Sequence, residues 1–193
     1  MNILPLDTET TGLPRKDLEL NHPSQPHLVA ISALQVDVDS NYVTQSVSVR
    51  VQPDGWEWDS EDRAFGVHQI TMEQAAKGIP ERHALDLLLN LWDADAELVA
   101  HNLAFDRQII AIAIARYYPD NRQLLQAWLD APGTCTMESS NEYVGATNTR
   151  GHKKKPSLKE AYTWATGEEL ERHHSANADA VACLHIYMAL QQL

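Results

Sequence analysis

Two acidic side chains near the N-terminus, Asp7 and Glu9, are separated by one residue in the segment 6–13 (LDTETTGL). In an extended strand, residues i and i+2 point to the same face, so the two carboxylates would lie side by side. Neighbouring carboxylates resist ionisation unless a cation lies between them, and their hard oxygen atoms suit Mg²⁺ or Mn²⁺. The pair predicts half of a metal site, which needs further carboxylates. Without them, it would be an ordinary pair on an exposed strand face.

A turn is expected directly after this strand, at Thr10, Thr11 and Gly12. Glycine can adopt backbone angles that are closed to other residues. The turn would place free backbone N–H groups and two hydroxyls beside the metal site, where a substrate could be held.

Asp106 is a candidate third carboxylate. It follows an expected buried strand at 97–100 and falls in the first turn of an expected helix at 104–118. The carboxyl ends of strands are where α/β proteins usually place their sites. The alternative is that Asp106 only complements the helix dipole.

Asp179 is a candidate fourth carboxylate, in the last expected helix, where flanking alanines would permit close packing against a sheet. The alternative is a solvated aspartate. His174 stands five residues earlier, which would place it about 140° from Asp179 on one continuous helix. Both can therefore serve one site only if His174 lies in the entering loop, with Ser175 or Asn177 as the helix cap.

The elements that must position these residues alternate between strand and helix. Strands are expected at 3–9, 28–37, 42–51 and 97–100, with a turn at 39–41 and with Pro5 accommodated by a bulge or a locally unpaired N–H. Helices are expected at 72–77, 80–92, 104–118, 121–131, 157–166 and 176–192. Two polar segments, 53–62 and 145–156, are expected to be loops. The first of them is expected to be solvated surface. This order predicts one mixed α/β domain that spans residues 1–193.

The 193-residue chain has a formal net charge of −12. That balance argues against a protein that holds nucleic acid by general electrostatics, but not against an enzyme that binds a short polyanion through metal ions and a local basic patch. Cys135 and Cys183 show neither metal-ligand spacing nor a disulfide framework. The apolar runs are too short to span a bilayer and the N-terminus has no signal-peptide pattern, so we expect a cytoplasmic protein without a membrane partner.

Four segments, taken together, resemble the DnaQ-like 3′→5′ exonucleases of the DEDDh type. They are 7–12 (DTETTG), 67–71 (VHQIT), 98–106 (LVAHNLAFD), and His174 with Asp179 five residues later. Their order and spacing agree with the family from Asp7 to about Tyr187. The chain departs from the family at Pro5, at Gln69 where glycine is common, and in its acidic charge, and these departures leave the substrate preference open.

The resemblance implies an RNase H-like fold, with a five-stranded mixed β-sheet flanked by α-helices. It also implies two bound Mg²⁺ or Mn²⁺ ions, a general base at His174, and four metal-binding carboxylates: Asp7, Glu9, Asp106 and Asp179. The neighbouring His173 has the wrong spacing to Asp179 for the base. The 3′-terminal nucleotide would be held by Thr10, Thr11, Gly12 and Leu13, in a pocket lined by His68, His101 and Phe105, while Asn102 supports the loop.

These residue types fit the hydrolysis of a phosphodiester bond. Two divalent ions roughly 4 Å apart can activate a water molecule and neutralise the departing 3′-oxygen. A histidine, whose ordinary pKa lies close to neutrality, can take the proton of that water. Together with this chemistry, the resemblance implies release of nucleoside 5′-monophosphates from the 3′ end of DNA or RNA, with a single strand as the expected substrate. A metal-dependent phosphatase acting on mononucleotides and a proofreading accessory module of a polymerase are the alternatives; a polymerase or homodimer partner is undetermined.

The segment 150–155 (RGHKKK) is the most basic stretch of the chain. A block of like charge is often only solvated. Because this block lies shortly before His174, the second interpretation is contact with the phosphates of an incoming single strand. Both interpretations stay open at this point.

Overall fold

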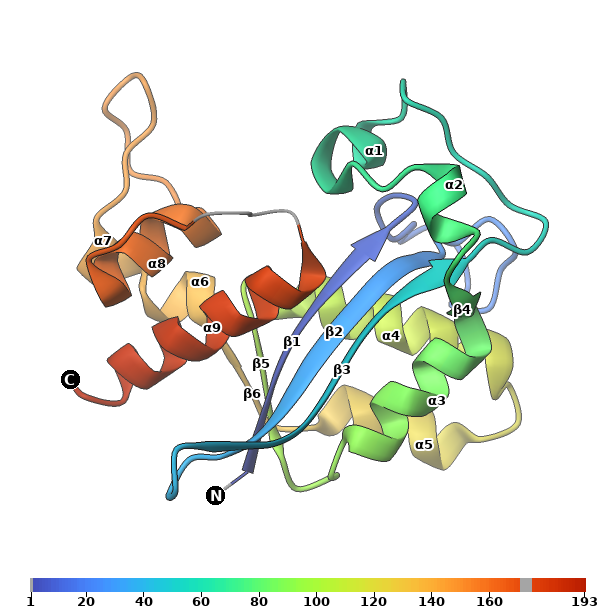
Figure 1. Cartoon of the computed structure of the whole chain (residues 1–193), viewed down its shortest axis with the longest axis horizontal. Helices are drawn as coiled ribbons and strands as arrows, with labels where there is room; N and C mark the ends of the chain where they lie inside the picture. Colours follow the sequence, from blue (N-terminus) through green and yellow to red (C-terminus); the bar gives the residue numbers. More distant parts are fainter. Residues whose placement is uncertain (1, 171–174) are drawn as a thin grey trace.

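A mixed sheet of six strands forms the centre of the part of the chain that the structure, a computed structural model, describes: residues 2–170 and 175–193 (Figure 1). The strands lie in the order β4-β3-β2-β1-β5-β6. Their bounds are β1 (Asn2–Thr10), β2 (Leu28–Asp37), β3 (Tyr42–Gln52), β4 (Ile79–Pro80), β5 (Glu97–Ala100) and β6 (Gly133–Cys135). Strands β1, β2 and β3 are antiparallel neighbours, whereas β4, β5 and β6 each join a neighbour in parallel.

The mixed α/β architecture is confirmed, but the sheet has six strands where the resemblance implied five. The edge strands β4 and β6 contain two and three residues. Such segments are too short to show the alternation by which a strand is recognised in a sequence. Pro80, expected to open a helix, closes β4 and is at the same time the N-cap residue of α3 (Glu81–Leu91).

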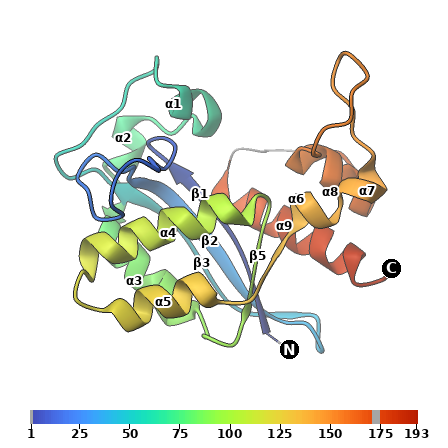
Figure 2. The same ribbon diagram turned by 180° about the vertical axis from the view of Figure 1, so that it is seen from behind.

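Helices cover both faces of the sheet (Figures 1 and 2). One face is covered by α3, α4 (Leu103–Tyr117) and α5 (Arg122–Asp130), and the other by α9 (Ala176–Leu190), against which α8 (Leu158–Thr166) packs. Four short helices complete the described chain: α1 (Arg63–His68), α2 (Met72–Ala75), α6 (Thr136–Ser139) and α7 (Asn141–Val144). Of these, only α2 was expected. It begins with a capping box, in which the side chains of Thr71 and Gln74 each accept a hydrogen bond from the backbone N–H of the other residue.

The alternation of β1 assigns its side chains to two different partners. Leu4 and Leu6 belong to the core cluster shared with α3 and α4, whereas Ile3 belongs to a second cluster that contains Cys183 and Tyr187 of α9. Because side chains two residues apart share a face, the odd-numbered residues of β1 face α9 and the even-numbered ones face α4. The acidic residues of this strand, both odd-numbered, are thereby directed to the α9 face.

Pro5 is accommodated in β1 without a bulge. The pairs Ile3↔Val36 and Leu6↔Ala33 flank it in the same register, and the ladder to β2 has no pair at Leu4 or Pro5. The expected bulge at Pro5 is therefore wrong, while the gap in the ladder agrees with a locally unpaired N–H. The register shift of β1 lies instead between Glu9 and Thr10, where the strand ends beside the candidate site.

A buried carboxylate ties the loop before β2 to the helices behind the sheet. Glu81 accepts hydrogen bonds from the Leu28 backbone N–H at 2.9 Å, the Arg116 guanidinium at 3.0 Å and the Tyr117 hydroxyl at 2.9 Å, and it contacts His27 Nδ1 at 2.7 Å. These partners lower the pKa of Glu81, although its burial acts in the opposite direction. The network holds the residues that follow the turn after β1.

No helix in the described ranges 2–170 and 175–193 is both long and apolar enough to cross a lipid bilayer.

Candidate active site

Three of the expected carboxylates converge at the end of β1. Asp7, Glu9 and Asp179 each offer an oxygen atom, and these atoms all lie within 4.8 Å of one another. Glu9 and Asp179 are each only 7% exposed. The cluster forms because the odd-numbered face of β1 packs against α9, and Asp179 lies in the first turn of that helix.

Asp106 reaches the same place from the opposite face of the sheet. It is 2% exposed and lies in the first turn of α4, as the sequence predicted. Its Oδ1 accepts hydrogen bonds from the backbone N–H of Thr8 at 3.0 Å and from the Thr8 hydroxyl at 2.8 Å. Thr8 is even-numbered and therefore points to α4. The strand β1 thus places two carboxylates on one side of its backbone and holds a third from the other side.

Burial raises the proton affinity of Asp7, Glu9 and Asp106, and neighbouring charges add to the effect at Asp7 and Glu9. Burial raises the pKa of Glu9 to about 8, with the charges of Asp179 and Asp106 adding to the effect. Burial raises the pKa of Asp106 to about 7, against the opposing hydrogen bonds from Thr8. The pKa of Asp7 is held well above its usual range by burial and then by the charges of its three neighbours. A bound cation would relieve this repulsion, and a set of carboxylate oxygens is the donor set that Mg²⁺ and Mn²⁺ prefer.

A cavity of about 710 Å³ opens in front of these carboxylates. Its walls include most of the residues expected to hold a nucleotide: Thr10, Thr11, Gly12, Leu13, His68, His101 and Phe105. Asn102 does not line the cavity. It has a positive φ of 81° at the N-cap position of α4, and its carbonyl accepts the Phe105 N–H at 2.8 Å, which fits the supporting role expected for it.

Five further residues line the cavity without having been expected there: Thr8, Asp62, Arg63, Ala64 and Val67. The last four come from α1 and the residue before it. The polar segment up to Asp62 was expected to be solvated surface, and nothing in its composition marks the short helix that follows. Only the motif at 67–71 hinted that this region contributes to a site.

The turn after β1 differs from the expected one. The Thr10 hydroxyl donates to the Gly12 carbonyl at 2.8 Å, and the Thr11 hydroxyl accepts the His27 N–H at 3.0 Å. The Thr11 N–H donates in turn to the His27 carbonyl at 3.0 Å. The two hydroxyls are therefore engaged within the protein. Gly12 does not use the glycine-specific backbone region, and a Cβ at this position would meet no atom within 4 Å.

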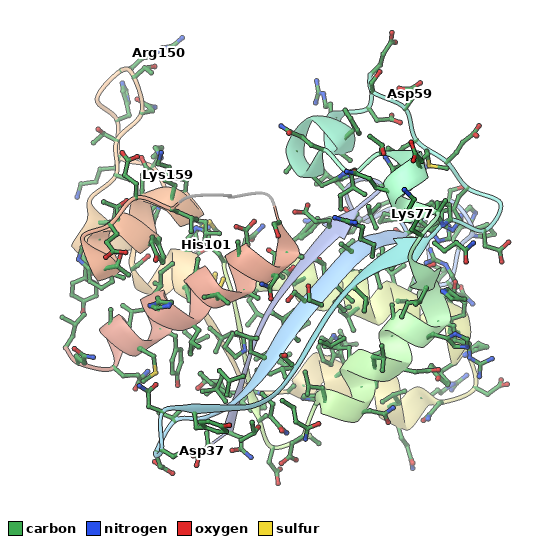
Figure 3. The ribbon with its side chains drawn as sticks, viewed as in Figure 1. Asp37, Asp59, Lys77, His101, Arg150 and Lys159 are labelled. Atoms are coloured by element: carbon green, nitrogen blue, oxygen red, sulfur yellow. The ribbon has the colours of Figure 1, made fainter. Side chains whose placement is uncertain are left out.

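Two histidines of the cavity have defined partners. His101, labelled in Figure 3, contacts the Pro156 carbonyl through Nε2 and the Thr136 hydroxyl through Nδ1, both at 3.0 Å. A carbonyl can only accept, so Nε2 carries the proton. His68 is 3% exposed, and its Nδ1 accepts the Ile70 N–H at 2.9 Å. Burial lowers the pKa of both rings, so both are neutral near pH 7.

The expected general base, His174, and its neighbour His173 lie outside the described residues. Ser175, the first residue described after them, takes the N-cap position of α9 and is one of the two caps that the sequence offered. Its side chain makes no capping hydrogen bond.

The basic segment 150–155 projects away from the body of the molecule, with Arg150 near its tip (Figure 3). Lys154 forms an ion pair with Glu160, and Lys155 forms one with Glu138. Two of its three lysines are therefore paired with carboxylates, but in exposed or half-exposed ion pairs of the kind that contribute little, so both interpretations of the segment stay open.

The sheet order and the two helical layers, with the acidic cluster at the end of β1, are those of an RNase H-like α/β fold. A family model described as exonuclease, RNase T type, matches residues 4–187. The chain belongs to this exonuclease family. The resemblance to the DnaQ-like DEDDh exonucleases, on which the expected fold and enzyme class were based, is confirmed.

Solved structures of the same fold include Escherichia coli exonuclease I in complex with a dA16 oligonucleotide, with 19% identity and a TM-score of 0.73 over 99% of this chain. They also include the nuclease domain of 3′hExo, a DEDDh family member, bound to rAMP, with 12% identity and a TM-score of 0.65 over 99% of this chain. The chain spans 41% of the exonuclease I chain and 92% of the 3′hExo domain. Among curated proteins, none matches this sequence significantly.

Proposed function

We propose that this protein is a metal-dependent 3′→5′ exonuclease that releases nucleoside 5′-monophosphates from the 3′ end of single-stranded DNA or RNA. The observation that carries the proposal is the convergence of Asp7, Glu9, Asp106 and Asp179 on the wall of one cavity. A volume of about 710 Å³ lies within the range of small-molecule sites and suits a nucleotide.

Asp7, Glu9, Asp106 and Asp179 are the residues that would hold two Mg²⁺ or Mn²⁺ ions. Such ions, when bound, supply an activated water and neutralise charge on the leaving oxygen. The protein contributes the rigid positions of the ligands, since β1 fixes Asp7 and Glu9 while Thr8 fixes the orientation of Asp106. In this proposal, His174 takes the proton of the attacking water.

The 3′-terminal nucleotide would occupy the cavity between the turn after β1 and the first turn of α4. Leu13, 78% exposed, and Phe105 offer apolar surface for the base. The open space above Gly12 leaves room for the sugar to approach the backbone. Both ring nitrogens of His101 are engaged within the protein, so this residue shapes the wall rather than donating to the nucleotide.

The comparisons support a nucleic-acid substrate and leave its sugar open, because one related structure holds a DNA oligonucleotide and another holds a ribonucleotide. We further propose that residues 1–193 form one catalytic domain and that the protein is cytoplasmic. A polymerase or a second copy of the chain is the proposed partner.

The test is digestion of 5′-labelled and 3′-labelled oligonucleotides, as matched DNA and RNA, in the presence of Mg²⁺. The proposal predicts a ladder of 5′-labelled products that shortens one nucleotide at a time and immediate release of the 3′ label as a 5′-mononucleotide. Release of inorganic phosphate from mononucleotides without shortening would identify a phosphatase instead. No hydrolysis of either kind would refute the proposal.

Two substitutions assign roles within this assay. Asp179→Asn is expected to abolish stepwise cleavage, whereas Asp120→Asn, at an exposed aspartate outside the cluster, keeps wild-type activity. His174→Ala is expected to lose most turnover and to keep metal binding, with His173→Ala as the matched control. If His174→Ala kept the wild-type turnover, His174 would not be the general base, and the role proposed for the carboxylates would still stand.

A further inference from the structure

A second cavity, of about 570 Å³, adjoins the catalytic one. His68 lines both cavities. The second cavity lies over the ends of β2 and β3, between α2 and the first turn of α9, and Lys77 marks its position in Figure 3. Asn177 lines it only two residues before Asp179, so the first turn of α9 borders both spaces. The two cavities therefore share a wall at His68.

The charge of the second cavity is opposite to that of the molecule. Arg50 of β3 and Lys77 line it, and among the described residues no acidic side chain does, although the whole chain has a net charge of −12. Within residues 2–170 and 175–193, the guanidinium of Arg50 has no hydrogen-bond or ion-pair partner. Lys77 contacts Glu73 at 3.1 Å, but both side chains are exposed, and pairs of this kind contribute little. Both cations are therefore available to an anionic ligand.

The backbone around this cavity has one uncommon conformation and one close approach. Gln69 has a positive φ of 53°, a conformation in which non-glycine residues are disfavoured by about 1 kcal/mol or more. Its side chain lines the second cavity, where the family commonly has glycine and thus no side chain. At Gly78, an added Cβ would lie 2.3 Å from the Arg50 carbonyl oxygen. This close approach brings Lys77 beside the strand that carries Arg50.

His68 forms part of the wall between the two cavities. Its Nδ1 accepts the Ile70 N–H, so the neutral ring carries its proton on Nε2. Within residues 2–170 and 175–193, Nε2 has no hydrogen-bond partner, and it is buried from solvent. The charged side chains that the second cavity offers to a ligand are therefore Arg50 and Lys77, and His68 only separates the two spaces.

We infer that the second cavity binds the phosphates on the 5′ side of the scissile bond, from the second and third nucleotides of the strand whose 3′ end occupies the catalytic cavity. This inference rests on the proposed function and adds the path of the substrate. Arg50 and Lys77 bind the backbone charge, while the amides of Gln69 and Asn177 can donate to or accept from any base. Recognition of this type is independent of sequence and depends on salt.

The test compares Arg50→Gln/Lys77→Gln with Arg82→Gln/Arg122→Gln, a control of equal net charge whose substituted residues line neither cavity. One substrate is a 5′-fluorescein dT6 oligonucleotide. The other is the p-nitrophenyl ester of thymidine 5′-monophosphate, which has a single nucleotide and cannot reach the second cavity. Hydrolysis of both is measured with Mg²⁺, and binding of dT6 is measured by anisotropy in EDTA over a range of salt concentrations.

The double variant is expected to raise KM and Kd for dT6 about tenfold at low salt, while hydrolysis of the ester stays at the wild-type rate. The slope of log Kd against log salt should fall by about 1.4, since each single-strand phosphate contact contributes about 0.7. The control should match the wild type in every measurement.

Equal KM, Kd and salt slope in wild type and double variant would overturn the inference and leave the exonuclease proposal standing. The inference would also be overturned if the double variant lost hydrolysis of the ester and of dT6 to the same degree, with an unchanged unfolding transition. The two cations would then act in the catalytic cavity. If the wild type hydrolyses neither substrate, the proposed function fails, and the anisotropy measurement still decides whether Arg50 and Lys77 bind the strand.

Discussion

The acidic cluster predicts that the metal-free protein becomes less stable as the pH rises. The pKa of Glu9 in the folded protein is about 8, against an ordinary value of 4.5, and that of Asp106 is about 7, against 3.8. Between these values the folded state binds more protons than the unfolded state, so the free energy of unfolding falls as the pH increases. The stability that protonation provides is fully present below pH 3.8 for Asp106 and below pH 4.5 for Glu9, and it is lost as the pH rises through about 7 and about 8, respectively.

The perturbation that isolates this effect is Glu9→Gln, which keeps the shape of the side chain and removes its charge. A difference of about 3.5 pH units, at 1.36 kcal/mol per unit, corresponds to about 5 kcal/mol. In EDTA, the variant should therefore be up to about 5 kcal/mol more stable than the wild type at pH 8 and equal to it near pH 4.5. For a chain of this length, the difference corresponds to a rise in Tm of about 10–20 °C.

The assay is urea unfolding followed by circular dichroism at pH 4.5, 6.5 and 8, in EDTA and in Mg²⁺. Glu57→Gln, at an exposed carboxylate outside the cluster, serves as the control and should follow the wild type at every pH. Added Mg²⁺ should stabilise the wild type at pH 8 by binding only the folded state. It should stabilise Glu9→Gln less, because the variant lacks one of the carboxylates.

A flat dependence of wild-type stability on pH between 4.5 and 8 in EDTA would refute this reasoning, because burial and the neighbouring charges would then not raise the pKa of these carboxyls. Equal stability of Glu9→Gln and wild type at pH 8 would refute it as well.

Three other substitutions test single contacts. Thr8→Val removes the 2.8 Å hydrogen bond to Asp106, so the pKa of this carboxyl should rise further, and the acidic limb of the pH profile of kcat/KM should move up by about one pH unit. Glu81→Gln leaves Arg116 in its partly buried site without a charged partner and should cost about 3–5 kcal/mol in urea unfolding. Gly78→Ala forces a Cβ to 2.3 Å from the backbone of β3 and should cost about 1–3 kcal/mol in the same measurement, with a smaller loss contradicting the close packing.

The long elements and the positions of the four candidate carboxylates could be predicted because their signals are local. The alternation of β1 fixes which side chains share a face, and a single Asp after a strand or within a helix can be placed from the sequence order. The partner of Asp106, by contrast, is Thr8, 98 residues away, and no local pattern reports such a contact.

The elements that the sequence did not reveal are short. β4 and β6 have two and three residues, and α1, α6 and α7 have four to six, which is too few to establish a period. The placement of Arg63 on the cavity wall was missed because α1 follows a polar segment that has the composition of solvated surface. Gly12 was misjudged for a different reason: glycine suggested a backbone conformation closed to other residues, but Gly12 does not adopt a positive φ and a Cβ there would meet no atom within 4 Å.

The central claim is that four carboxylates from β1, α4 and α9 together bind divalent metal ions. Anomalous diffraction from crystals of the full chain grown with Mn²⁺ tests this claim most directly. Two Mn²⁺ peaks in contact with Asp7, Glu9, Asp106 and Asp179 are the predicted result. Mn²⁺ bound elsewhere, or a cluster that stays free of Mn²⁺ at saturating concentration, would contradict it.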